Sequence, residues 1–534
     1  MQKPWTALAA ALASLLLVML APPLAHADDV GSTTEYVTIS GADDTDLKAL
    51  VITPTGRPGP HPLLVMPSAW GTNNLLYVGA ARRLAYESGY QVVSYTSRGF
   101  WDSGGGIEVA GPKDVTDARK VIDWALDNTD ADPDRIGMAG ISYGAGISLL
   151  TSAVDDRVKA VGAMSGWSDL AASIYPNETV SFQTVEMLLA VGRITGRLGD
   201  DLEHVEDEYR RGNLQPALDI APERSAATKI DLINANDPAV MIAHAWNDGI
   251  FPPGPLTDFY SGLSTDKRLM LTPGDHATPE AFGAFGLPNE TWESLTRWFD
   301  HHLRGVDNGI DAEDPVRLKP NNGSGGWVTY PDWESVTATT DTHYLTEPRR
   351  SFERWQSTGG LSGDPATGWD YDIRTGVDTL ANSGTLLASG ALQQFADIPT
   401  GVSLPFVNRY RAGVWTSEPY EDGATVSGAP LAHLTVTPSR ADTSLFVYLY
   451  AVDRYGTGAL ITHKPVTLRD AAPGEPVAID VELDPVVWDV PAGHELTLVV
   501  DTKDPRYTSE SRIGGEVEFG SPEDDPSWLS VPMA

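Results

Sequence analysis

Three polar residues of the sequence have the types and the order that nucleophilic catalysis requires. Ser142 lies in RIGMAGISYGAG (135–146), where a short apolar strand is expected to run into a Gly-x-Ser-x-Gly turn and then a helix. A serine hydroxyl attacks an acyl carbon effectively only when a base removes its proton and a carboxylate orients that base. In one arrangement on a parallel sheet the order is Ser, Asp, His, each directly after a strand.

The two partners occur in that order. Asp248 follows AVMIAHAW (239–246), and His276 follows KRLMLTP (267–273). Asp275 could compete for the carboxylate role, but it is adjacent to His276 in sequence and has no preceding strand to hold it. We therefore predict a triad of Ser142, Asp248 and His276, against the alternative of three unrelated loop residues.

The oxyanion that forms during acyl transfer needs two hydrogen-bond donors aimed at it. The backbone N–H of Tyr143, directly after the nucleophile, is the expected first donor. The second should come from PSAWG (67–71), the loop that follows the apolar run LLVMP. Ser68, through its hydroxyl or its amide, is the first candidate, and the amides of Ala69 and Trp70 come next.

The elements that would position these residues alternate between strands and helices. Short apolar runs bounded by turn residues recur from Tyr36 to about Gly305, and DVTDARKVIDWALDN (114–128) between two of them has a helical apolar stripe. This alternation predicts an α/β domain with a mostly parallel sheet covered on both faces. About 70 residues separate two of the strands, and we expect them (about 166–238) to form a helical cap over the site. The alternative is a peripheral helical decoration.

The second half of the chain has a different pattern. After DNGIDAEDP (307–315), glycine, proline, threonine and alternating valines dominate, as in SLFVYLYAVD, and convincing long helices are absent. Such a pattern is typical of an all-β sandwich or jelly roll. We predict a signal peptide over 1–27, a catalytic domain over 28–310 and a C-terminal β domain over 311–534.

The amino terminus and the charge indicate where the protein works. Lys3, an apolar run from Trp5 to Ala21 and the Ala25–His26–Ala27 site form a signal peptide, which predicts cleavage after Ala27 and export. The alternative, an uncleaved anchor, would be short for a bilayer. The net charge of −36 becomes −37 when Lys3 is removed, and such a surface repels nucleic acid and anionic membranes. We expect neither as a stable partner.

No motif of the sequence calls for a metal or cofactor, and we expect none. HExxH, Walker and GxGxxG motifs are absent, and the chain has no cysteine, which excludes thiolate sites. The acidic segments GADDTD and EDGATVSG are read as turns in preference to calcium sites. His301 and His302 are adjacent on a predicted helix and would not face one site.

Several of these motifs together resemble the Xaa-Pro dipeptidyl-peptidase-like hydrolases, the group that includes cocaine esterase. The resemblance covers nearly all the mature chain and is carried by an ordered series of motifs: SRGFWDSGG, DVTDARKVIDWALDN, GISYGAG, WNDGIFPP, RWFDHHLRGVDNGI, GGWVTYPDWES and WDVPAGHELTLVVDTKDPRYT. It implies an α/β-hydrolase domain with an inserted helical cap, a C-terminal jelly roll and triad roles for Ser142, Asp248 and His276. The family usually has a tyrosine hydroxyl in the oxyanion hole, where this chain has Ser68, and often a glycine where it has Ala277.

The resemblance leaves the substrate open. A dipeptidyl peptidase binds a free amine, normally through a carboxylate, for which the cap offers many acids, including Asp169, Glu178, Glu186 and Asp200. An esterase needs only an acyl pocket, and its candidate walls are Trp70, Trp167, Phe182 and Trp246, although core packing is the alternative for each of them. We predict a secreted serine hydrolase that acts on a small peptide or ester through an acyl-enzyme. Xaa-Pro dipeptidyl-peptidase-like activity is placed slightly ahead of carboxylesterase activity, and a surface-polymer binding protein with a vestigial hydrolase domain is the alternative from another class.

Overall fold

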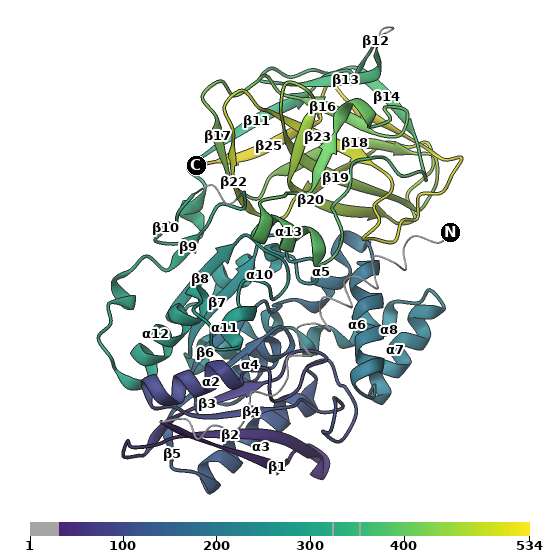
Figure 1. The fold of residues 1–534 in the computed structure, drawn as a ribbon. Helices are drawn as coiled ribbons and strands as arrows, with labels where there is room; N and C mark the ends of the chain where they lie inside the picture. The colour runs from purple at the N-terminus through teal and green to yellow at the C-terminus, as the bar shows by residue number, and fades with distance from the viewer. Residues whose placement is uncertain (1–30, 323–324, 352–353) are drawn as a thin grey trace.

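The computed structural model describes residues 31–322, 325–351 and 354–534 (Figure 1). The predicted signal peptide and its cleavage site after Ala27 lie outside the described residues. Within the described part, an α/β domain forms the lower half of the molecule in Figure 1, and a β-rich domain lies above it. The predicted fold class, an α/β-hydrolase-like domain followed by a β-rich domain, is confirmed.

The α/β domain is built on one sheet with the strand order β1-β2-β4-β3-β5-β6-β7-β8-β9-β10. The strands from β4 to β9 in this order are parallel, whereas β1, β2 and β10 pair antiparallel. Their bounds are β1 Ser32–Ser40, β2 Asp46–Pro54, β3 His61–Pro67, β4 Gln91–Tyr95, β5 Ala131–Ile141, β6 Val158–Met164, β7 Ala239–Ala245, β8 Lys267–Thr272, β9 Val316–Leu318 and β10 Val328–Tyr330. Because the parallel strands all end at the same edge, the loops that follow them converge there.

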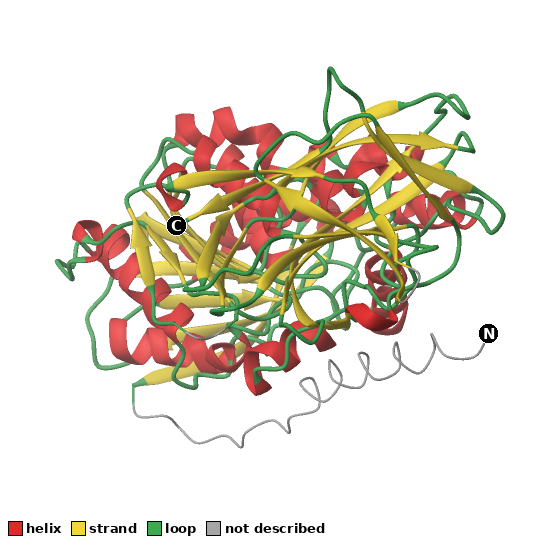
Figure 2. Cartoon of the chain, turned by 90° about the horizontal axis from the view of Figure 1, so that it is seen from above, coloured by secondary structure: helices red, strands yellow, loops and turns green. Residues whose placement is uncertain are grey.

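Helices cover both faces of this sheet, as the view of Figure 2 shows. The helices that flank it are α2 Val78–Arg83, α3 Pro112–Asn128, α4 Tyr143–Val154, α10 Pro253–Gly262, α11 Ala281–Ala284 and α12 Glu290–Arg304. In α3 the predicted apolar stripe is buried. The helix begins with Pro112, and the amide N–H of the preceding Gly111 donates a hydrogen bond to the Asp114 carboxylate. Helices α3 and α4 pack on one face of the sheet, while α2 and α12 pack on the other.

The segment between β6 and β7 is helical and contains α5 Leu170–Ile174, α6 Phe182–Thr195, α7 Asp200–Arg210, α8 Gln215–Ile220 and α9 Ile230–Asn236. Helices α6 and α7 are two separate helices, not one continuous helix. The chain is extended between them because Gly196 forms a bridge with Phe100 and Leu198 one with Ile107. The segment touches loops at the carboxyl edge of the sheet, since Thr184 of α6 donates a hydrogen bond to Gly249 O.

In the described residues, the β-rich domain has fifteen strands: β11 Thr339–Leu345, β12 Arg349–Ser351, β13 Arg354–Ser362, β14 Trp369–Arg374, β15 Gly401–Ser403, β16 Gly413–Thr416, β17 Ala424–Gly428, β18 Leu431–Pro438, β19 Thr443–Val452, β20 Thr457–Leu468, β21 Val477–Glu482, β22 Val486–Val490, β23 Glu495–Asp501, β24 Glu516–Ser521 and β25 Trp528–Met533. Strand β19 is buried on both faces, with Leu445 and Val447 in the main core and Phe446 and Tyr448 in a second cluster. One helix that the sequence pattern did not indicate, α13 (Ala388–Ala396), lies on the side of this domain that faces the catalytic domain (Figure 1).

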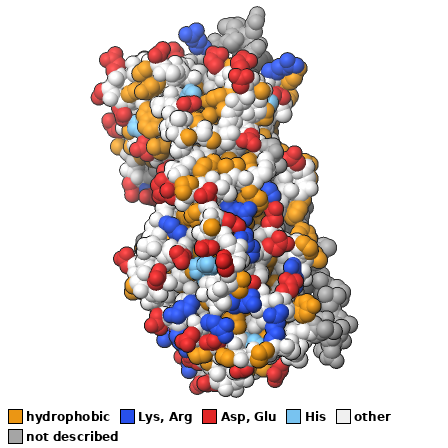
Figure 3. Space-filling view, turned by 90° about the vertical axis from the view of Figure 1, so that its left-hand side faces the viewer, with side chains coloured by type: hydrophobic (Ala, Val, Ile, Leu, Met, Phe, Trp, Pro, Cys, Tyr) orange, Lys and Arg blue, Asp and Glu red, His pale blue; other side chains and the backbone are white. Residues whose placement is uncertain are grey.

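The outer surface carries charges of both signs. On the face drawn in Figure 3, acidic side chains are scattered over both domains, and basic side chains lie among them on the catalytic domain. Among the helices that the structure describes, none has the length and apolar character needed to cross a bilayer.

Candidate active site

Ser142 lies at the sharp turn between β5 and α4. Its backbone has φ 57° and ψ −114°, a conformation that side-chain-bearing residues adopt only where the surroundings enforce it. The glycines of the motif permit this turn: a Cβ on Gly140 would lie 2.3 Å from the backbone of Gly144, and one on Gly144 would lie 2.2 Å from Pro67 O. The turn holds the serine at the carboxyl edge of the sheet, where it is 6 % exposed.

The structure brings the three predicted triad residues together. His276 Nε2 lies 2.8 Å from Ser142 Oγ, and His276 Nδ1 lies 2.8 Å from Asp248 Oδ2. Since a carboxylate only accepts, Nδ1 carries a proton and Nε2 is free to accept the proton of the serine hydroxyl. The geometry is that of a nucleophile, a base and an orienting acid.

The surroundings keep Asp248 ionised. Burial alone would raise the pKa of Asp248, but His276 and backbone N–H donors lower it below its ordinary value. The amides of Ile250 and Phe251 both donate to Asp248 Oδ1, at 2.9 and 2.8 Å. The reciprocal effect acts on His276: burial lowers its pKa, but Asp248 outweighs burial and the pKa is raised. The site thus stabilises the imidazolium that forms when His276 accepts a proton.

Asp275, the competing carboxylate, binds backbone amides and not the imidazole of His276. Its Oδ1 accepts the amides of His276 at 2.8 Å and Gly249 at 3.0 Å, so it ties the histidine loop to the aspartate loop. Burial raises the pKa of Asp275, and Arg506 of the β-rich domain lowers it in part. Asp248, not Asp275, therefore faces the imidazole.

The oxyanion donors can be sorted by which groups are already engaged. None of the hydrogen bonds in the described part of the chain uses the Tyr143 amide, which leaves it available. Ser68 is fully buried: its amide donates to Tyr95 O, and its hydroxyl accepts the Ser97 amide at 3.1 Å. Both groups of Ser68 are thus engaged with residues of β4 and the loop that follows it, and the amides of Ala69 and Trp70 stay candidates for the second donor.

A series of aromatic rings runs from the residue after the nucleophile to the triad histidine. Trp70, Tyr143, Trp167, Phe251 and His276 form a continuous series of ring contacts with centroid separations between 5.0 and 6.4 Å. Trp70 and Trp167 also donate to carbonyls of the helical segment, at Leu188 and Arg224.

Of the predicted pocket walls, Trp70 and Trp167 are linked to the triad by these ring contacts. Trp246 points away from the nucleophile toward the domain interface, where its indole N–H donates to Lys319 O. Phe182 begins helix α6 and is 41 % exposed.

The acids of the helical segment are mostly engaged. Asp169 caps α5 by accepting the Ala172 amide. Glu178 pairs with Arg469 of the β-rich domain, and Glu186 pairs with Tyr209 and Arg210. The fourth, Asp200, is exposed at the start of α7. Three of these four carboxylates therefore have hydrogen-bond or ion-pair partners within the chain.

A fully buried carboxyl, Glu280, also lies in the site, and no sequence pattern pointed to it. It follows His276 by four residues, and neither carboxyl oxygen has a hydrogen bond that meets ordinary geometry. Burial raises the pKa of Glu280 to about 7, although Ser165 and His276 oppose the rise. Such a carboxyl is largely protonated in mildly acidic solution and is forced to ionise in a dry site above neutrality.

This raised pKa predicts a pH-dependent stability difference between wild type and Glu280→Gln. A carboxyl whose pKa is higher folded than unfolded favours folding below its unfolded value and loses that contribution as pH rises through the folded value. Urea unfolding should therefore show the variant gaining on the order of 3 kcal/mol relative to wild type between about pH 4.5 and about pH 8. A difference that does not change with pH would contradict a neutral, buried Glu280.

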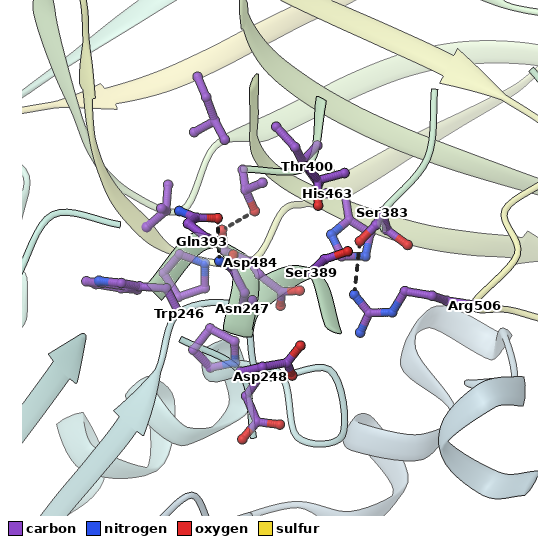
Figure 4. A pocket seen from close by; sticks show the side chains of 18 of the residues that line it. Trp246, Asn247, Asp248, Ser383, Ser389, Gln393, Thr400, His463, Asp484 and Arg506 are labelled. Carbon is purple, nitrogen blue, oxygen red and sulfur yellow. Dashed lines mark hydrogen bonds between the residues drawn. The ribbon is translucent and has the colours of Figure 1, made fainter. Parts of the chain in front are cut away.

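The β-rich domain reaches into the loops of the triad. Arg506 donates through Nη2 to Gly249 O at 3.1 Å and through Nη1 to Ser383 O at 3.3 Å. It also borders a cavity of about 30 Å³ between the domains, large enough for about two waters (Figure 4). Trp246, Asn247 and Asp248 line this cavity from the catalytic side, and its opposite wall includes Ser389 and His463.

Two protein-family models match the chain. Residues 43–278 match the X-Pro dipeptidyl-peptidase (S15 family) model, and residues 308–518 match the model of the X-Pro dipeptidyl-peptidase C-terminal non-catalytic domain. The first match contains all three triad positions. Together the matches cover both domains of the fold.

Curated relatives are similar at low identity. The chain is 24% identical over 241 residues to a putative serine esterase of Mycobacterium bovis, covering 43% of this chain and 35% of that protein. It is 21% identical over 465 residues to a putative Xaa-Pro dipeptidyl-peptidase of Bacillus cereus, covering 80% of this chain and 73% of that one. The chain therefore spans only about a third of the mycobacterial relative.

Solved structures share the fold over almost the whole chain. An α-amino acid ester hydrolase superposes with a TM-score of 0.71 at 16% identity, covering 97% of this chain and 99% of the other. A CocE/NonD family hydrolase from Staphylococcus aureus gives 0.71 at 13% identity, with 97% and 100% covered. At these identities the likeness establishes the shared two-domain fold.

Proposed function

Since this chain carries both domains of the X-Pro dipeptidyl-peptidase (S15) family, we propose that it is an exported serine hydrolase that cleaves acyl bonds through an acyl-enzyme on Ser142. The observation that carries the proposal is the hydrogen-bonded series Ser142–His276–Asp248 at a strained turn. A positive-φ backbone at a serine costs stability, and such strain is concentrated at functional sites. Here the strained serine has its base 2.8 Å away.

The chemistry follows from these positions. His276 Nε2 takes the proton of Ser142 as Oγ bonds to the acyl carbon, and Asp248 stabilises the resulting imidazolium. The oxyanion is received by the Tyr143 amide and by an amide of Ala69 or Trp70. His276 then gives its proton to the leaving group, and a water activated by the same base hydrolyses the acyl-enzyme.

Acyl esters are the substrate class that the site favours. A dipeptidyl peptidase must hold a free ammonium group, and three of the four cap carboxylates offered for this are engaged in capping or ion pairs. An ester needs only the apolar wall beside the nucleophile, which Trp70 and Trp167 supply. The second candidate, X-Pro dipeptidyl-peptidase activity, is favoured by the family match and by the relative from Bacillus cereus.

A substrate panel separates these candidates. Short acyl esters of a chromogenic alcohol should be hydrolysed with kcat/KM at least about tenfold above that of Xaa-Pro anilides, since the amide bond is the less reactive of the two. The opposite ranking would assign the site to the peptidase reaction. Failure of both substrate series with correctly folded protein would contradict the proposed function.

Export is part of the proposal and has its own test. The amino-terminal motif from Lys3 to Ala27 supports recognition and cleavage by a signal peptidase. Protein recovered from the medium of an expressing bacterial culture should begin at Asp28 when its amino terminus is sequenced. Intact protein retained in the cell with Met1 in place would contradict export.

A further inference from the structure

Asp248 has a second histidine beside it. His244 lies in β7, four residues before Asp248, and both side chains are completely shielded from solvent. His244 Nε2 is 2.7 Å from Phe251 O and 3.5 Å from Asp248 Oδ2. An ionisable residue in an otherwise apolar, buried strand needs such partners to offset its desolvation.

The contacts of His244 fix which ring nitrogen carries its proton. A carbonyl oxygen can only accept, so the 2.7 Å contact with Phe251 O places the proton on Nε2. Nδ1 is buried and has no hydrogen-bond partner among the described residues, which agrees with a proton on Nε2. Burial lowers the pKa of His244, so the ring stays neutral and presents a fixed N–H dipole.

The residue whose carbonyl binds His244 also binds Asp248 through its amide. The amide of Phe251 donates to Asp248 Oδ1 at 2.8 Å while its carbonyl accepts from His244. The ring of Phe251 in turn packs edge-to-face on His276, with centroids 5.3 Å apart. One residue therefore connects His244 with the acid and the base of the triad.

We infer that His244 is a positioning residue of the triad, which fixes the loop 248–251 through Phe251 O and so sets Asp248 against His276. The inference rests on the proposed function, because it assigns His244 a part in the same reaction. His244 does not touch the substrate or Ser142. Its action is to hold Asp248 Oδ1 on two amides, so that Oδ2 stays directed at His276 Nδ1.

Two substitutions separate this role from simple packing. His244→Leu places an apolar side chain in β7 and removes the donor to Phe251 O, which frees the loop 248–251. His244→Gln keeps a side-chain N–H able to reach that carbonyl. His61→Leu is the matched control, because His61 is also a buried histidine of the same sheet, but it begins β3 at the edge opposite the triad.

The experiment measures ester hydrolysis by the protein with both of its domains. A proton NMR spectrum of each variant is also recorded. For His244→Leu, kcat should fall about 10- to 100-fold with KM changed less than about twofold, because alignment and not substrate binding is lost. His244→Gln should recover kcat to within about fivefold of wild type, and His61→Leu should retain it. The far-downfield resonance of the proton between His276 and Asp248 should disappear or broaden only in His244→Leu.

Each contrary result has a definite meaning. The inference is overturned if His244→Leu retains kcat and the downfield resonance, or if His61→Leu loses as much activity as His244→Leu. It is also overturned if His244→Gln is as impaired as His244→Leu. Covalent labelling of wild-type Ser142 by a fluorophosphonate keeps these failures separate, since a wild type that does not label contradicts the proposed function itself.

Discussion

Replacing Ser142 by alanine should lower kcat by about 10⁴-fold or more while leaving the fold intact. The hydroxyl is the atom that bonds to the acyl carbon, and its removal leaves His276 with no nucleophile to deprotonate. The smaller side chain also fits the turn, because alanine adds no atoms at φ 57°. Steady-state ester hydrolysis measures the loss, and circular dichroism with thermal unfolding verifies that the variant is folded.

Ser148→Ala is the matched control for this variant. Ser148 is a buried serine of α4, the helix that begins directly after Ser142, and among the described residues its hydroxyl donates to Gly144 O one turn earlier. Its replacement should change kcat by less than about twofold, because a neutral hydrogen bond contributes about 1 kcal/mol to stability and nothing here to chemistry. Equal losses in the two variants would indicate damage to α4 instead of removal of a nucleophile.

Replacing Arg98 by methionine should reduce the free energy of unfolding by about 3–5 kcal/mol, the largest stability effect that we expect. Arg98 forms a bidentate pair with Asp117, with both contacts at 2.7 Å, and both side chains are almost completely buried. Without the guanidinium, Asp117 is left as a buried carboxylate opposite the amide of Ala42 alone. Urea unfolding with fluorescence detection measures the loss.

Two further variants test whether the loss of stability in Arg98→Met comes from the unpaired, buried Asp117. Arg83→Met removes an exposed ion pair between Arg83, the last residue of α2, and Glu87, and should cost less than about 1 kcal/mol. The double variant Arg98→Met, Asp117→Leu should recover much of the loss, because it removes the unpaired charge together with its partner. Equal costs for Arg98→Met and Arg83→Met would show that burial of the pair contributes little.

The parts of the site that could be predicted from sequence depend on short-range patterns. The Gly-x-Ser-x-Gly turn needs small residues at Gly140 and Gly144 for local packing, and that requirement is visible in the sequence itself. The buried parallel strands are apolar runs in the sequence. Each predicted strand end therefore indicated a loop in which a polar residue could be catalytic. The chain order then singled out Asp248 and His276, which the structure places within hydrogen-bonding distance.

The remaining parts depend on contacts between distant residues. Ser68 follows a strand as an oxyanion donor would, but its turn toward Ser97 is set by a neighbouring strand, 29 residues away. Arg506 lies 257 residues from the carbonyl that it binds, so no spacing could connect them. His244 did carry a signal, a single ionisable side chain within an apolar strand, although its partner Phe251 could not be identified without the fold.

The central claim is that Ser142 is an activated nucleophile, and covalent labelling tests it most directly. The full-length mature protein is treated with a fluorophosphonate, and the modified peptide is located by mass spectrometry. We predict one adduct per chain, on Ser142, which is absent from Ser142→Ala and slowed when His276 is replaced. Folded wild-type protein that does not label, or that labels at another serine, would contradict the account.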